Sequence, residues 1–160
     1  MRQNNIFNNL FVFDLANNHQ GDVDHGKLII NDLASKIKKH KVKGAIKFQF
    51  RQLDTFVHPD HLSNSDNKHI PRFLSTRLDK SDYSDLLSTV REKKLIAMTT
   101  PFDEESVDIA IELDFDILKI ASCSAKDWPL IEKIASAGKP VIFSTGGLTM
   151  TDIDNLVSFF

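Results

Sequence analysis

Two lysines stand inside short apolar runs of this sequence, where charged residues are unusual. Lys47 lies within residues 45–50 and Lys119 within residues 117–122. Lysines in buried strands are rare unless they are paired or used, so for either one alone a structural ion pair is an equally good explanation. Two ammonium groups at equivalent strand ends, with hydroxyl groups nearby, can neutralise and hydrogen-bond a dianion such as phosphate. The pattern therefore favours an anion site built from Lys47, Lys119, Thr100, Ser122 and Ser144.

Other polar residues lie next to these runs. Asp14 ends the first apolar run and is its only carboxylate, which leaves a general base, a metal ligand and an N-cap for the following turn open. Gln49 is two residues from Lys47, so the two side chains project to the same side of a strand. His19 is more typical of a loop or capping residue than of a catalyst. Cys123 has no base beside it in the sequence and is expected to be a small buried hydrophobic residue.

Short β-rich runs alternate with amphipathic helical segments. Strands are predicted at 10–15, 45–50, 95–100, 117–122 and 140–145, with helices at 24–40, 81–93, 104–113, 128–137 and from 151 onward. Residues 10–15 read as a buried strand that is apolar on both faces up to its aspartate. Five strand–helix units in succession predict a parallel sheet whose strand order follows the sequence.

Every predicted strand ends in polar or ionisable residues, which is typical of the active face of a (β/α)8 TIM-type barrel in the α/β class. Such barrels need roughly 250 residues, whereas this chain has 160, enough for about five of the eight units. We therefore expect residues 1–160 to form one partial barrel domain that continues beyond the chain end. The glycine-rich turn of dinucleotide-binding folds and the Walker phosphate loop are both absent.

Composition narrows the classes of function. The net charge of −2 argues against a protein that coats nucleic acid or an anionic membrane. A single cysteine excludes an internal disulfide framework, and no apolar run approaches the ~18 residues of a membrane span. A cytoplasmic protein with neither nucleic acid nor membrane as a partner is the expectation. The histidines at 58, 61 and 69 lack a metal-ligand spacing, so no metal site is predicted in this chain.

Five ordered segments resemble the motifs of the N-acetylneuraminate (sialic acid) synthase family. They are residues 14–21, 45–49, 99–103, 118–122 and 139–146. The resemblance implies a transferase of sialic acid biosynthesis that joins phosphoenolpyruvate to an N-acetylated aldose, forming a nonulosonic acid and releasing phosphate. It also implies a divalent metal, Mn²⁺ or Mg²⁺, with ligands outside this chain, small-molecule partners, and a full-length form for which a homodimer stays open.

By the same resemblance, phosphoenolpyruvate would be held by Lys47, Thr100, Lys119, Ser122 and Ser144. Asp14 and Gln49 would be the catalytic residues, with Gln49 beside the reacting end of phosphoenolpyruvate.

Two departures from the family pattern bear on catalysis. The family usually has glutamate at position 14, and it has Gly-Glu where Cys123 and Ser124 stand here, so a carboxylate expected near the sugar is missing. The alternative is a divergent or truncated module that binds phosphate-bearing ligands, or pairs with another chain, without turnover.

Overall fold

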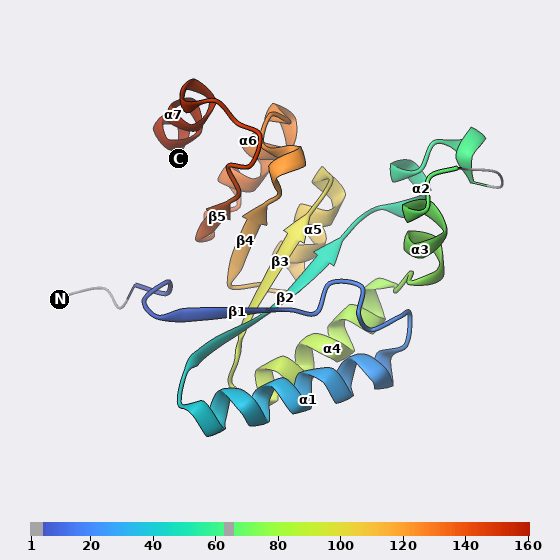
Figure 1. Ribbon diagram of the computed structural model, residues 1–160, viewed down its shortest axis with the longest axis vertical. Helices are drawn as coiled ribbons and strands as arrows, with labels where there is room; N and C mark the ends of the chain where they lie inside the picture. The colour runs from blue at the N-terminus through green and yellow to red at the C-terminus, as the bar shows by residue number, and fades with distance from the viewer. Residues whose placement is uncertain (1–4, 63–65) are drawn as a thin grey trace.

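The sheet of this protein has five parallel strands in the order β1-β2-β3-β4-β5, which confirms the predicted topology. The computed structural model describes residues 5–62 and 66–160. The strands are β1 (Leu10–Asp14), β2 (Lys43–Phe50), β3 (Ile96–Pro101), β4 (Ile117–Ile120) and β5 (Val141–Phe143). They form a curled half-barrel with helices outside it (Figure 1).

The helices are α1 (Val23–His40), α2 (Leu53–Phe56), α3 (His69–Ser75), α4 (Lys80–Glu92), α5 (Glu104–Glu112), α6 (Trp128–Ser136) and α7 (Met150–Phe159), with short 3₁₀ turns η1 (Pro59–His61) and η2 (Ser122–Ser124). Five helices follow the strands as the sequence pattern predicts, whereas two short ones, α2 and α3, lie between β2 and α4, where no helix was predicted. Side-chain caps fix where the long helices begin, because they satisfy amide groups that the first turn leaves free. Asp22 accepts a hydrogen bond from the His25 amide at the start of α1, and Asp79 and Asp82 form a capping box at the start of α4. Among the described residues, no helix combines the length and the apolarity that a membrane crossing requires.

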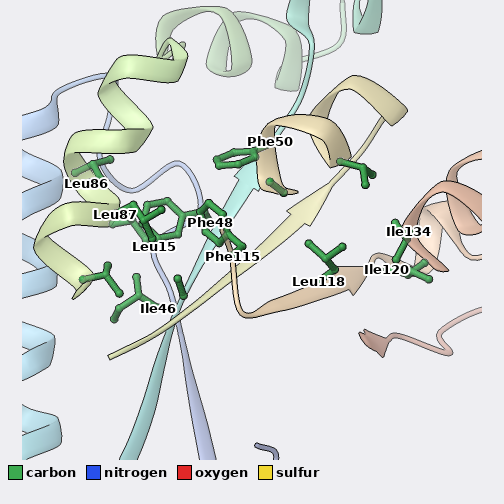
Figure 2. Packing of buried hydrophobic residues seen from close by; sticks show 14 of the residues in the cluster. Leu15, Ile46, Phe48, Phe50, Leu86, Leu87, Phe115, Leu118, Ile120 and Ile134 are labelled. Carbon is green, nitrogen blue, oxygen red and sulfur yellow. The ribbon is translucent and has the colours of Figure 1, made fainter. Parts of the chain in front are cut away.

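The main core lies between the outer face of the sheet and helices α1, α4, α5 and α6. Figure 2 shows Phe48 and Phe50 of β2 close to Phe115, which precedes β4. The Phe48 and Phe115 rings meet edge to face, with centroids 5.5 Å apart and an interplanar angle of 80°. Such aromatic pairs stabilise by about 0.5–1.5 kcal/mol beyond the area they bury. This packing holds β2, β3 and β4 in a fixed arrangement beneath their polar ends.

A second, smaller core lies on the inner face of the sheet. Its fully buried members are Ala45, Met98 and Ile117, one each from β2, β3 and β4. Because side chains alternate along a strand, residues two positions further on project from the same face. The inner apolar layer therefore supports whatever lies at the carboxyl ends of these strands.

β1 corrects one prediction, because it is not a buried strand. Phe11 is 54% exposed and Val12 is 40% exposed. In the part of the chain that the structure describes, β1 is an edge strand paired with β2, and little packs over Phe11 on one of its faces or Val12 on the other.

Gly44 allows α1 to approach the sheet closely, and its replacement gives a test of this packing. A Cβ atom at this position would lie 2.5 Å from Cδ1 and 3.0 Å from Cγ1 of Ile37. We expect Gly44→Ala to destabilise the protein by about 1–3 kcal/mol, as overpacking in a well-packed core does. The measurement is the urea unfolding midpoint. Ile37→Val removes the clashing methyl group, so Gly44→Ala should cost less stability in the Ile37→Val protein than in the wild-type protein. An equal loss of stability in the two proteins would contradict the packing argument.

Candidate active site

The strand register brings five of the seven predicted site residues to one face of the sheet, while Ser122 and Ser144 lie outside the strands. Asp14 is the Cα partner of Lys47, and Gln49 is the partner of Thr100. Lys47 and Lys119 lie two residues beyond the inner-core residues Ala45 and Ile117; Lys119 is the penultimate residue of β4, and Lys47 is in the second half of β2, three residues before its end. Since partners in neighbouring strands project to the same side, these side chains share the inner face. This arrangement agrees with the prediction made from alternation along β2.

Lys47 and Asp14 form an ion pair across β1 and β2. The distance from Lys47 Nζ to Asp14 Oδ2 is 2.7 Å. The lysine side chain is 10% exposed and that of the aspartate 52%. Within the described residues, no backbone amide of the turn after β1 donates to the Asp14 carboxylate, so the capping role left open for it is not observed, and α1 is capped by Asp22 instead. The structural ion pair that was weighed for Lys47 is present, and it leaves the outer side of the Asp14 carboxylate open to solvent.

Lys119 lies within electrostatic range of this pair. Burial lowers the pKa of Lys119, and the positive charge of Lys47 lowers it further, while Asp14 acts in the opposite direction. Like charges held in proximity disfavour the charged form of each other. The two ammonium groups therefore form an electropositive site in which one aspartate balances one of them, and an anionic ligand would relieve the remaining repulsion.

The hydroxyl groups of the site differ in their surroundings. Thr100 is 1% exposed, and its Oγ1 has no hydrogen-bond partner within the described ranges 5–62 and 66–160. A buried hydroxyl without a partner costs free energy, so this atom is suited to a ligand. Ser144 follows β5 and its amide donates to the Ile120 carbonyl at 3.1 Å. Ser122 begins η2 next to the β5–α7 loop, where a Cβ atom at Gly146 would lie 3.9 Å from Ser122 Oγ.

Arg51 is a site residue that the sequence reading missed. Its Nη2 donates a hydrogen bond to Gln49 Oε1 at 2.8 Å. The guanidinium carbon lies 4.1 Å from the ring centroid of Phe102 and 4.4 Å from that of Phe73. Burial lowers the pKa of Arg51, which remains a cation because guanidinium pKa values are far above neutrality. The sequence signal that could have indicated Arg51 is its two-residue spacing from Gln49, which places both side chains on the same side of the chain. The aromatic rings around Arg51 could not be predicted, because they come from distant parts of the sequence.

The predictions for Cys123 and His19 have different outcomes. The prediction for Cys123 is wrong: the residue is exposed rather than buried, since η2 turns it out of the sheet. His19 is a loop residue as expected, yet it is only 1% exposed, and its Nδ1 accepts from the Gly21 amide at 3.0 Å. Burial lowers the pKa of His19, which favours the neutral ring. Its Nδ1 contact is the local loop interaction that such a residue is expected to make.

A divalent metal does not fit the residues that the structure describes. In residues 5–62 and 66–160, no three His, Cys, Asp or Glu side chains are close enough to hold one. Ser124, which stands where the family pattern has glutamate, is 7% exposed and supplies no carboxylate. No step is therefore assigned to a metal held by these residues.

The lowered pKa of Lys119 predicts how anion binding depends on pH. Above pH 7 a phosphate monoester is almost fully ionised, so affinity there follows the ammonium groups. Because the pKa of Lys119 is below its usual 10.5, we expect phosphoenolpyruvate affinity to fall at a lower pH than an ordinary lysine would give. In the window between the two pKa values the unfolded chain binds more protons, so this group makes folding stability rise with pH there.

The check on this pH dependence is titration calorimetry with phosphoenolpyruvate between pH 7 and 10, using Lys119→Arg as the comparison. Arginine stays charged over this range, so its affinity should decline less. Identical pH profiles for the two proteins would contradict the role given to Lys119.

A family model and several sequences of known proteins match this chain. The model of the NeuB family matches residues 35–160. The N,N'-diacetyllegionaminic acid synthase of Campylobacter jejuni is 27% identical over 157 residues, which cover 93% of this chain and 46% of that protein.

Two solved structures extend the comparison. A Chromobacterium violaceum protein that carries the name spore coat polysaccharide biosynthesis protein E has a TM-score of 0.91 and 43% identity, covering 94% of this chain and 45% of its own. The N-acetylneuraminic acid synthetase of Leptospira borgpetersenii, solved with citrate, has a TM-score of 0.79 and 26% identity over 95% of this chain and 49% of its own. This chain thus spans less than half the length of each relative described here.

Proposed function

This chain belongs to the NeuB family, and we propose that it supplies the phosphoenolpyruvate-binding part of a condensing synthase. In the proposed reaction, carbon three of phosphoenolpyruvate forms a bond to the aldehyde carbon of an N-acetylated aldose, and the aldehyde oxygen takes up a proton. Water adds at carbon two, and phosphate leaves as that oxygen is installed. The product would be a nonulosonic acid of the sialic acid type. The observation that carries the proposal is the shared inner face, where Lys47 and Lys119 lie with the unpartnered hydroxyl of Thr100.

The lysines and hydroxyl residues of the site would act by binding and orientation. The two ammonium groups would neutralise the phosphate and carboxylate charges, because charge-assisted hydrogen bonds are the strongest available to such a ligand. The hydroxyl groups of Thr100, Ser122 and Ser144 would donate to its oxygen atoms. Holding the ligand in one orientation converts an encounter in solution into a reaction within a complex. Residues on rigid strands would contribute to the reaction rate mainly through this orientation.

The open side of Asp14 is proposed to serve catalysis. Its carboxylate is fixed by Lys47 at 2.7 Å and remains half exposed. A carboxylate in this position can accept or return a proton next to the bound ligand. Lys47 would then have two roles, because it both orients this carboxylate and attracts the phosphate.

Other features of the longer enzyme remain proposals. They are the divalent metal with ligands outside this chain, small molecules as the partners, and a cytoplasmic location, for which the single cysteine is the supporting observation. Whether the full-length form is a homodimer is left open, because the structure describes a single chain.

The test of the proposed function is ligand binding followed by turnover, using the protein in the longest form that its reading frame encodes. Calorimetry with phosphoenolpyruvate should give saturable binding that pyruvate, which lacks the phosphate, does not match. Phosphate release in the presence of Mn²⁺ and N-acetylmannosamine or a related aldose would then report condensation. Binding without phosphate release would favour the non-catalytic ligand-binding module, and absence of binding would reject both.

A further inference from the structure

We propose that Arg51 is a positioning residue that fixes the side-chain amide of Gln49, so that the amide NH₂ group, and not its oxygen, is presented to the ligand. The inference rests on the proposed function, because the ligand it invokes is the phosphoenolpyruvate of that site. It assigns a role to a residue that stands outside the anion-binding set.

The chemistry of the guanidinium group fixes the orientation of the amide. Arginine carries five N–H donors and no acceptor, so the Gln49 atom that it meets must be the carbonyl oxygen. Nη2 of Arg51 lies 2.8 Å from Gln49 Oε1, and the opposite orientation would set two donors against each other. Within residues 5–62 and 66–160, Gln49 Nε2 has no hydrogen-bond partner. Gln49 is the register partner of Thr100, so this free donor and the unpartnered Thr100 hydroxyl belong to the same face.

Arg51 itself is held by contacts that a lysine could not reproduce. Its guanidinium lies 4.4 Å from the ring of Phe73, 4.1 Å from that of Phe102 and 5.7 Å from that of Phe56. A planar delocalised cation stacks on aromatic faces, whereas an ammonium group is more strongly hydrated and lacks the plane. The three rings come from α2, α3 and the segment after β3. Helices α2 and α3 therefore help to fix the orientation of the Gln49 amide, because their rings hold Arg51 in place.

A purely structural role for Arg51 is the competing explanation. In that case the arginine anchors α2 and α3 to the barrel, and Gln49 is merely a convenient acceptor. The two explanations differ in whether the effect of Arg51 on ligand binding passes through Gln49. A double-mutant cycle measures this coupling directly.

The experiment uses Arg51→Met, Gln49→Met and the double variant in the longest form that the reading frame encodes, with phosphoenolpyruvate as the calorimetric probe. We expect Arg51→Met to weaken binding about tenfold with Gln49 present and by no more than about twofold in the Gln49→Met background. Loss of positive charge alone would weaken binding equally in both backgrounds. Arg72→Met is the matched control, because Arg72 is an exposed cation of α3. Equal effects of Arg51→Met in the two backgrounds would overturn the proposal.

A second readout separates this proposal from the proposed function. The Gln49 side-chain ¹⁵N–¹H pair can be identified by its absence from the spectrum of Gln49→Met. We expect Arg51→Met to displace that pair in the absence of any ligand, and Arg72→Met to leave it in place. If the wild-type protein binds no phosphoenolpyruvate but the pair moves, the positioning role stands and the ligand assignment fails. An unmoved pair overturns the positioning role even where phosphoenolpyruvate binds.

Discussion

Lys47→Met is expected to weaken phosphoenolpyruvate binding by about a hundredfold while leaving the fold intact. A hydrogen bond to a charged group contributes roughly 1.5–3 kcal/mol, which corresponds to between tenfold and about a hundredfold in affinity. The upper end applies here because Lys47 is paired with Asp14 at 2.7 Å. Its removal leaves an unbalanced carboxylate next to the anion. The larger effect should therefore come from Lys47→Met and the smaller one from Lys119→Met.

Stability should change little in the Lys47→Met variant. Methionine has a similar shape, and the Asp14 carboxylate that loses its partner is half exposed, so water can solvate it and the penalty for a charge left unpaired in the interior does not apply. Lys39→Met is the matched control, because Lys39 is an exposed lysine in the last turn of α1, at the opposite ends of the strands from the site. The measurements are calorimetric dissociation constants and melting temperatures for the three proteins. Unchanged affinity in Lys47→Met and Lys119→Met together would reject the anion site.

Most of the fold and the inner-face set could be predicted from local patterns. Alternation along β2 placed Lys47 and Gln49 on one side, and strand–helix alternation gave the parallel order that the structure confirms. Both inferences depend only on periodicity within a few residues. The pairing of Asp14 with Lys47 depends instead on the register between β1 and β2, and register is not encoded in either strand alone.

The predictions that failed concern exposure and long-range packing. Phe11 and Val12 read as buried because they are apolar, but burial also requires a neighbour on the far side of β1. Cys123 was expected to be buried because no base lies beside it in the sequence, whereas η2 directs it outward. Arg51 was missed because Phe73 and Phe102 lie 22 and 51 residues further along the sequence and meet only after folding. Composition and spacing carry little information about such contacts.

These contacts also explain how one small set of residues can serve both binding and chemistry. The inner core beneath the site is apolar and fully buried at Ala45, Met98 and Ile117. A charged group placed above such a layer has few solvent partners on its lower side, which strengthens its interactions with other groups at the strand ends. Asp14 is the exception, because its carboxylate is half exposed. Replacing Asp14 should therefore affect ligand affinity and turnover differently.

Asp14→Asn is expected to bind phosphoenolpyruvate more tightly and to turn it over at least a hundredfold more slowly. Asparagine keeps an oxygen that can accept from Lys47, but it removes one negative charge beside the anion, which should increase affinity by up to about tenfold. The same change removes a carboxylate that could accept a proton. Tighter binding with lost turnover is the pattern of a group that acts in the transition state rather than in ground-state binding.

Stability distinguishes this outcome from a structural role for Asp14. Asparagine keeps an oxygen that can accept from the buried Lys47 ammonium group, and the side chain at position 14 is half exposed, so the melting temperature should change by no more than a few degrees. Asp32→Asn provides the matched control, since it breaks the exposed pair of Asp32 with Lys36 on α1, away from the site. The measurements are calorimetry, phosphate release and melting temperature on the longest form of the protein. If Asp14→Asn melts far below Asp32→Asn but retains activity per folded molecule, the carboxylate is a structural partner of Lys47, and the proton-transfer role must be given up.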